Sequence, residues 1–252
     1  RRTRSRPQRH HPRLLATRTA WLMARMLCLD VQARPSPETL RFWRQAGMAP
    51  EIFAQRASER PFNFADTVWP IPLGYSRIKQ DDLLQIGGRD WRVHIGNGHA
   101  PEHATLWSET DNLVLVGDQV LSSISPNIGL YATEPEADPV EDWLEACNRL
   151  AGLAEERHLV LGGHKLPFSG LPLRLRQLIE NHHGALDRLL RDLDHPKTAG
   201  ECFMALFKRK IKAGEYGLAL AEAFAHLHHL YLHGQVRRAI RADGAYTYQR
   251  NE

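Results

Sequence analysis

The chain has 252 residues, with 33 Lys and Arg against 29 Asp and Glu, a formal net charge of +4 and only three cysteines. This length can bury a sizeable core, in one large domain or in a large and a small one. No apolar run approaches the roughly 20 residues that span a bilayer. Cys28, Cys147 and Cys202 are too widely spaced for a disulfide framework or a zinc ribbon, so we expect a protein without a membrane partner in the reducing cytoplasm.

The first segment, residues 1–13, holds six Arg and no acidic residue. We expect a disordered, solvated basic tail here. An RNA-binding or targeting arm is the sharper alternative, and an incorrectly started or frame-shifted gene end is another. The rest of the chain sums to a charge of −2, so the basic balance of the whole chain does not by itself indicate nucleic-acid binding.

Helical patterns follow the basic segment. One covers residues 17–30, and a second, SPETLRFWRQAGM, opens with Ser36 as the N-cap and Pro37 at the first helical position. Gly47 stands near its end, where glycine commonly stops a helix. A third helix is predicted in PEIFAQRASER, and the Pro-punctuated stretch PFNFADTVWPIPLG after it is predicted to be a loop.

From Asp82 the pattern changes towards strands. Residues 83–97 read as two strands joined at Gly87 and Gly88, and residues 103–118 as another pair joined by the polar ETDN. A helix follows with Asp138 as its N-cap, and then the strand HLVLGG. Strands that alternate with covering helices predict a layered α/β domain.

Three of these strands share one pattern, in which an apolar run and a glycine are followed by a residue type that binds metals. The segments are VHIGNGHAPEH at 93–103, LVLVGDQV at 113–120 and HLVLGGH at 158–164. They place His99, Asp118 and His164 just beyond strand ends, where separate loops can converge on one ion. Glycine permits the sharp turn that aims each side chain, and two His with one Asp suit zinc, iron or manganese.

The same segments carry a family resemblance. GHAPEH resembles the GHTxGH segment of the metallo-beta-lactamase fold, LVGDQV its (T/S)GD segment and LGGH its last metal-binding GH, in the same order and spacing. The resemblance covers roughly residues 14–175. GDQVLSSISPNIG followed by EPEADPVEDWLEACNRL is closer still to a bacterial subgroup of hydrolases whose chains end in a winged-helix domain. The resemblance to the metallo-beta-lactamase fold implies a four-layer αββα sandwich.

The resemblance also implies an activity: hydrolysis by a metal-bound hydroxide, with substrates that range over thioesters, lactams, phosphodiesters and RNA. Here the substrate would be a small molecule or an ester-type compound, with a thioester, phosphodiester or other ester or amide bond. His99 would bind one of two zinc ions, Asp118 would bridge both ions as the catalytic carboxylate, and His164 would bind the second. His103 would lie behind these ligands and stabilise the turn. Iron or manganese are alternatives to zinc.

One departure bears on this interpretation. Relatives carry an HxHxDH segment upstream that supplies further ligands, and this sequence contains no such string. His10 and His11 are adjacent and would point to opposite faces of an extended chain, so they cannot replace a His-x-His pair. We therefore expect a sandwich that is incomplete on its N-terminal side, with three ligands. The alternative is a catalytically impaired remnant that binds nucleic acid or protein through the basic arm and the winged helix.

Aromatic residues are frequent in the predicted loop and just beyond it. In relatives this region lies over the active site, so Phe64, Trp69 and Tyr75, with Phe62 beside them, could line a substrate pocket. Core or loop packing is the commoner role of such residues. Both interpretations stay open at this point.

The sequence predicts a boundary near residue 173, so that residues 14–172 form the metallo-beta-lactamase-like domain and residues 173–252 a smaller one. The smaller part shows three helical patterns and a hairpin signal at Asp243 and Gly244, which are the elements of a winged helix. Glutamates and histidines on the last helix favour a packing or dimerisation module over a nucleic-acid reader. His182 shares the apolar stripe of its helix, and His229 and His233 have the i, i+4 spacing of a metal-binding pair but no carboxylate or Cys partner at a fitting position. The histidines on these helices are therefore predicted to lie on the surface: His182, His183, His226, His228, His229 and His233.

Overall fold

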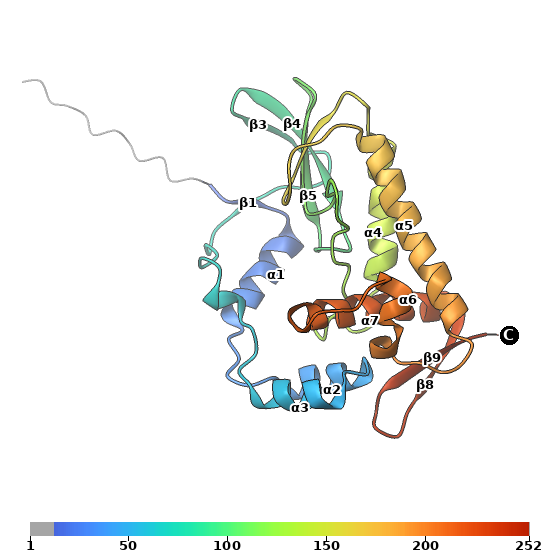
Figure 1. The fold of residues 1–252 in the computed structure, drawn as a ribbon. Helices are drawn as coiled ribbons and strands as arrows, with labels where there is room; N and C mark the ends of the chain where they lie inside the picture. Colours follow the sequence, from blue (N-terminus) through green and yellow to red (C-terminus); the bar gives the residue numbers. More distant parts are fainter. Residues whose placement is uncertain (1–12, 252) are drawn as a thin grey trace, which may run out of the picture.

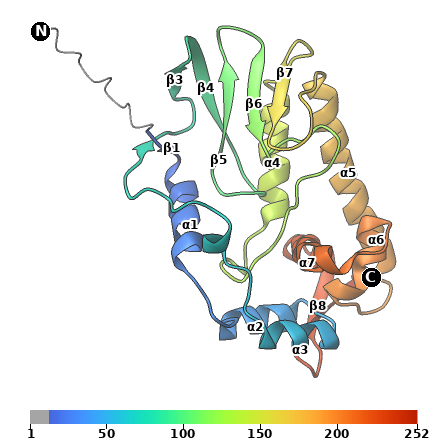
Figure 2. The same ribbon diagram turned by 60° about the vertical axis from the view of Figure 1, so that its left-hand side comes forward.

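The structure is a computed structural model that describes residues 13–251, and its centre is a five-stranded sheet. Figures 1 and 2 show the sheet with two long helices alongside it. The strand order is β3-β4-β5-β6-β7; the first four pair antiparallel, and β7 runs parallel to β6. The strands are β3 Leu83–Ile86, β4 Arg89–Gly96, β5 His103–Ser108, β6 Leu113–Gly117 and β7 Leu159–Gly162.

Alternating burial in the central strands shows why they form a sheet with one face covered. Trp91 and Val93 are buried on β4, as are Val114 and Val116 on β6. Because side chains alternate along a strand, this period of two places the apolar residues on one face. Helix α4 (Pro139–Ala151) connects β6 to β7 and contributes its buried side chains to the same core. The glycines at 87 and 88 both have positive φ angles, as the tight β3–β4 turn requires.

Three helices precede the sheet, as the sequence predicts: α1 Arg18–Leu29, α2 Pro37–Gln45 and α3 Pro50–Ser58. The Ser36 hydroxyl accepts the amide N–H of Thr39, so the predicted N-cap of α2 is present. Near the start of the described chain, β1 (Leu15–Ala16) pairs in parallel with β2 (Ser76–Arg77), which lies just before the large sheet in the sequence. The loop between α3 and β2 contains the short 3₁₀ helix η1 (Phe64–Asp66).

The C-terminal part consists of helices and a hairpin. The helices are α5 Leu171–Asp192, α6 Phe203–Phe207 and α7 Tyr216–Leu232, with short 3₁₀ turns η2 (Ala199–Cys202) and η3 (Ala213–Glu215), and the hairpin is β8 Val236–Ile240 with β9 Tyr246–Arg250. Gly244 has a positive φ in the hairpin turn. These elements are the predicted ones; that they form a winged helix, and that a domain boundary lies at 173, stay predictions.

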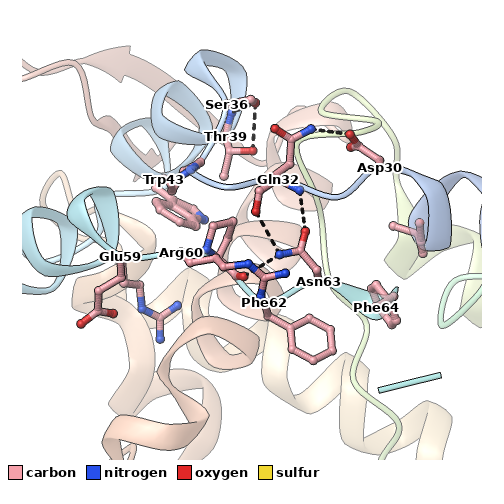
Figure 3. Close-up of a pocket in the computed structure, with 14 residues that line it drawn as sticks. Asp30, Gln32, Ser36, Thr39, Trp43, Glu59, Arg60, Phe62, Asn63 and Phe64 are labelled. Carbon is pink, nitrogen blue, oxygen red and sulfur yellow. Dashed lines mark hydrogen bonds between the residues drawn. The ribbon is translucent and has the colours of Figure 1, made fainter. Parts of the chain in front are cut away.

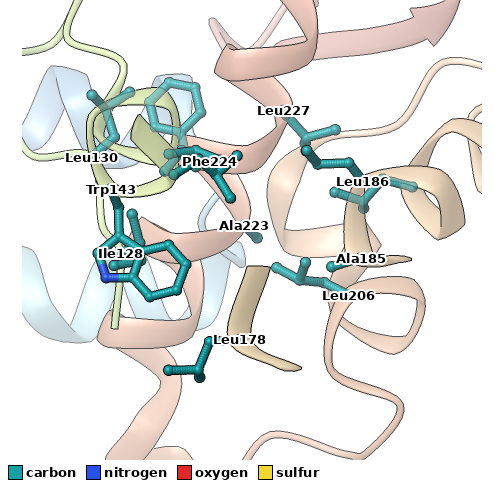
Figure 4. Packing of buried hydrophobic residues seen from close by; sticks show 14 of the residues in the cluster. Ile128, Leu130, Trp143, Leu178, Ala185, Leu186, Leu206, Ala223, Phe224 and Leu227 are labelled. Carbon is teal, nitrogen blue, oxygen red and sulfur yellow. The ribbon is translucent and has the colours of Figure 1, made fainter. Parts of the chain in front are cut away.

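One hydrophobic core joins the two parts. It contains Val114 and Val160 of the sheet, Trp143 of α4, Leu178 of α5 and Phe224 of α7, and Figure 4 shows the packing of the helical side chains. The mixed α/β fold predicted from the sequence is confirmed. Within residues 13–251 there is one large sheet, so a second large sheet of an αββα sandwich is not found in the described part. No helix in this range is both long and apolar enough to cross a membrane.

The histidines of the C-terminal helices differ from the surface prediction. His182, His226, His228 and His229 are all buried. The reason is the position of α7, which packs against α4, α5, α6 and β8 and is therefore covered on almost every side. An i, i+4 pattern within one helix cannot reveal neighbours that arrive from several other elements.

Two of these histidines form a buried hydrogen-bond chain. His226 Nδ1 is 2.8 Å from the Glu222 carbonyl oxygen, so this nitrogen carries the proton and donates it. His226 Nε2 then accepts from His182 Nδ1 at 3.1 Å, and His182 Nε2 accepts from the Ser125 hydroxyl at 3.0 Å. Both rings are neutral in this arrangement. Burial lowers the pKa of His182 to about 3, with a further lowering by His226, and burial lowers the pKa of His226 to about 4.

This chain predicts loss of stability in mild acid. Below pH 6.5 both histidines become protonated in the unfolded chain but stay neutral in the folded protein. The free energy of unfolding must therefore fall as the pH drops from about 6.5 towards 4. His182→Gln removes one of these two groups, so it should reduce the slope of unfolding free energy against pH by roughly 1.4 kcal/mol per pH unit, the contribution of about one proton. Urea unfolding followed by tryptophan fluorescence measures the slope. The exposed neighbour variant His183→Gln is the control, and equal slopes in both variants would contradict the prediction.

Candidate metal centre

The three candidate ligands come together at one edge of the sheet. Strands β4, β6 and β7 run in the same direction, since β4 and β6 are both antiparallel to β5 and β7 is parallel to β6. Their carboxyl ends therefore lie at the same edge, and the loops after them carry His99, Asp118 and His164. Asp118 Oδ2 lies 3.6 Å from His99 Nε2 and 3.3 Å from His164 Nε2. Both imidazoles thus face one carboxylate oxygen.

The glycines before the ligands act in two different ways. Gly98 and Gly117 have φ angles of 87° and 50°, a backbone region that side chains with a Cβ rarely adopt. Gly163 has no such angle. A Cβ at Gly163 would instead lie 2.1 Å from Asp118 Oδ1. The third glycine therefore provides space for the central carboxylate rather than a turn.

A hydrogen bond fixes the orientation of the His99 ring. Its Nδ1 is 2.9 Å from the backbone oxygen of Asn127, which can only accept, so Nδ1 carries the proton. Nε2 is then left with its lone pair directed towards Asp118. This is the arrangement that metal-binding histidines show, with the second ring nitrogen donating to a backbone carbonyl.

The loop that holds His99 is anchored on α7. The Asn127 side-chain amide donates to Glu222 Oε2 at 2.7 Å and to the Leu218 carbonyl oxygen at 3.2 Å. Burial raises the pKa of Glu222 to about 7, and the bond from Asn127 offsets part of that rise. Glu222 of the C-terminal part therefore holds Asn127, and Asn127 in turn orients the candidate ligand His99. Sequence analysis did not identify Asn127 or Glu222.

His103 lies behind the ligands, at the first position of β5. Its ring centre is 6.3 Å from that of His99, and a Cβ on Gly117 would come within 2.5 Å of its Nε2. Burial lowers the pKa of His103, and the neighbouring His99 lowers it further. Its buried Nδ1 has no hydrogen-bond partner among the described residues. A packing role beside Gly117 accords with this position.

The donor set fits a divalent cation. Asp118 Oδ1 is buried and has no hydrogen-bond partner within residues 13–251. An ionised carboxylate with one uncompensated buried oxygen is costly, and a cation is the usual compensation in proteins. Two imidazoles and one carboxylate match the preferences of zinc, and three protein donors leave a coordination position open.

A cavity of about 530 Å³ lies elsewhere, between α1, α2 and the segment 59–64 (Figure 3). Phe64 lines it, but Trp69 and Tyr75 do not, and neither does any of the three candidate ligands. Trp69 is 90% exposed, and Tyr75 stacks on Trp21 with ring centres 4.7 Å apart. The three aromatic residues therefore do not share one wall in this structure.

The structure also forms a second cluster of metal-binding residue types, which the sequence does not predict because its carboxylate is distant along the chain. One ligand atom from each of Asp138, His229 and His233 lies within 4.8 Å of the others. The sequence gives Asp138 as a helix cap and the two histidines as surface residues, without a partner for either. Only the i, i+4 spacing of the histidines was a local signal, and the carboxylate that completes the cluster is 91 residues away from His229.

Family models match both parts of the chain. Residues 30–164 match the metallo-beta-lactamase superfamily, and residues 186–251 match the C-terminal domain called metallo-beta-lactamase-like. The chain belongs to the metallo-beta-lactamase superfamily. The family resemblance stated from the sequence is thereby confirmed, and the superfamily match contains His99, Asp118 and His164, which is its last residue.

Two solved structures resemble this fold over most of the chain. A beta-lactamase domain protein from Burkholderia ambifaria is 31% identical with a TM-score of 0.84, over 95% of this chain and 66% of that one. A metallo-beta-lactamase family protein from Thermus thermophilus is 27% identical with a TM-score of 0.74, over 95% and 72%. The probable metallo-hydrolase YqjP of Bacillus subtilis (strain 168) is 27% identical over 145 residues, 56% of this chain and 44% of YqjP. The chain thus spans less than half of YqjP and about two thirds of the Burkholderia protein.

Gly163→Ala should weaken metal binding at the candidate site. The added Cβ would collide with Asp118 Oδ1 and push the carboxylate out of line with the two imidazoles. We expect zinc affinity to fall roughly 10-fold or more, as when groups that orient metal ligands are lost. Isothermal titration with zinc measures the change. Gly74→Ala, where a Cβ meets nothing within 4 Å, is the matched control; equal affinities for the two variants would sink the idea.

Glu222→Gln should stabilise the protein at alkaline pH. The folded protein holds a proton on Glu222 between about pH 4.5 and 7 that the unfolded chain has lost, so this group makes stability fall as pH rises through that window. Gln keeps an acceptor for Asn127 without a charge to bury. The variant should therefore match the wild type near pH 4 and exceed its unfolding free energy by about 2 to 3 kcal/mol at pH 8. Chemical denaturation at both pH values is the measurement, with the exposed Glu145→Gln as control.

Proposed function

We propose that the chain is a metal-dependent hydrolase in which His99, Asp118 and His164 hold the ion. The observation that carries the proposal is the convergence of both imidazole Nε2 atoms on Asp118 Oδ2, while Oδ1 of the same carboxylate stays buried and unpaired among the described residues. Membership of the metallo-beta-lactamase superfamily and the similarity to the probable metallo-hydrolase YqjP agree with it. Zinc is the preferred ion, and iron or manganese suit the same donors.

A bound ion would lower the pKa of a water molecule and polarise the bond to be hydrolysed. The residues of this chain supply orientation and charge. Asn127 holds the His99 ring so that Nε2 faces the site, and Asp118 supplies the negative charge that balances a cation. The His164 side chain is 63% exposed, so the site opens to solvent on that side and a small substrate can approach it.

The substrate is proposed only as a class: a small molecule with a thioester, phosphodiester or other ester or amide bond. The assignment of His99 to one zinc ion and His164 to a second, with Asp118 bridging them, stays a prediction. The same holds for a substrate pocket formed by Phe64, Trp69 and Tyr75. Superfamily folds serve many reactions, so the substrate must be found by assay.

We propose that residues 173–252 act as a packing module for residues 14–172. The bond from Asn127 to Glu222 and the shared core support this role. No observation favours nucleic-acid binding, which stays a prediction: Arg241 pairs with Asp243 at 2.9 Å, and Arg238 lies over the rings of Tyr231 and Tyr246. The basic segment 1–13 lies outside the described residues except for its last residue. Homodimer formation is likewise only predicted.

Asp118→Asn should abolish zinc binding at the proposed site and reduce hydrolysis. The loss should exceed the roughly 10- to 100-fold that outer partners of metal ligands cost, because Asp118 is the residue that both histidines face. Zinc content and turnover of a phosphodiester and a thioester are the measurements, with the exposed Asp187→Asn as control. Turnover that is unaffected by Asp118→Asn, or that persists in metal-free protein, would overturn the proposal.

A further inference from the structure

A second set of metal-binding side chains lies where α4 meets α7. Asp138 directly precedes α4, His229 lies in the last turn of α7, and His233 is the first residue after that helix. His229 Nδ1 is 3.1 Å from Asp138 Oδ1 and 3.0 Å from Oδ2, and His233 Nε2 is 3.2 Å from Oδ2. One carboxylate therefore meets two imidazole nitrogens, with none of the hydrolase-site residues involved.

The spacing of these atoms matches a zinc site. Zinc bonds of about 2.0 to 2.2 Å in tetrahedral geometry place neighbouring ligand atoms roughly 3.3 to 3.5 Å apart. The distances from Asp138 Oδ2 to the two nitrogens, 3.0 and 3.2 Å, are close to that range and need only a small adjustment. Glu141 Oε2 lies 3.7 Å from His233 Nε2 and is available as a fourth donor.

The donors are held in place before any ion arrives. Asp138 Oδ1 accepts the amide N–H of Glu141 at 3.1 Å, which fixes the carboxylate at the start of α4. The two imidazoles are four residues apart on a helix, with ring centres 4.2 Å apart, so they project from the same face. Asp138 and His229 are largely buried, whereas the His233 side chain is 42% exposed and leaves one open side for an ion to enter.

We propose that Asp138, His229 and His233 form a second zinc site that ties α7 to the start of α4. The helices belong to different family matches, since α4 falls within residues 30–164 and α7 within residues 186–251. The ion would therefore join the C-terminal helices to the sheet-bearing part. The inference stands on these three residues alone and does not depend on the proposed hydrolase function.

The experiment must separate this site from the hydrolase site. The starting protein is the full chain with His99→Ala and His164→Ala, stripped with a chelator, dialysed against zinc and analysed for bound metal. One zinc per chain is expected to remain. Adding His233→Gln should remove it, or weaken its affinity at least 10-fold. His195→Gln is the matched control, because His195 is an exposed histidine beside an aspartate, 2.5 Å from Asp194 Oδ1.

Asp138→Asn is a second variant that tests whether metal loss is caused by misfolding. Asn caps a helix about as well as Asp, so the fold should be kept, but Asn is a poorer zinc ligand. It should also lose the metal while its circular dichroism spectrum stays unchanged. In the starting protein, zinc at 100 times Kd should raise the unfolding midpoint by roughly 5 to 10 °C, and the rise should vanish with His233→Gln. A starting protein that binds no zinc, or zinc that is indifferent to both His233→Gln and Asp138→Asn, overturns the proposal.

Discussion

The parallel pairing of β6 with β7 is the constraint on which the candidate site depends. Parallel strands cannot be joined by a tight turn, so the chain must cross over between them, and here α4 is part of that crossover. The pairing aligns the ends of both strands and thereby places Asp118 beside His164. It also requires α4 to pack on the sheet, which buries Trp143 in the core and leaves Asp138 at the helix start facing α7. The second proposed metal site depends in addition on the packing of α7 against α4.

The burial of α7 is the second feature with wide effects. A helix packed against several other elements shields most of its polar side chains from water, so those side chains favour partners within the protein. His226 and Glu222 do so by bonding to His182 and Asn127. The desolvated groups respond to pH in opposite directions: the neutral histidines favour folding at higher pH, and the Glu222 carboxyl favours it at lower pH. The hydrogen bond between Glu222 and Asn127 also anchors on α7 the loop whose backbone orients the His99 ring.

Much of the fold and of the candidate site could be predicted from the sequence because its signals are local. The Ser36 cap, the Gly87–Gly88 turn and the strand-glycine-ligand pattern each occupy a few consecutive residues, and the structure places them as the pattern predicts. The bonds between distant elements could not be predicted. Asp138 and His229 each had a plausible local role, as a cap and as a surface residue, and only tertiary packing brings them together. Gly163 shows a subtler limit, since its place in the pattern was foreseen but its reason, space for Asp118, was not.

Helix α5 has a mechanical consequence. It begins at Leu171, soon after His164, and runs without interruption to Asp192, inside the region that matches the C-terminal family model. At 1.5 Å per residue its 22 residues form a rod about 33 Å long. Most of the segment between the two family matches is thus a rigid helix and not a flexible linker. A protease or a hinge motion acting there would first have to unwind a helix whose inner face is part of the core.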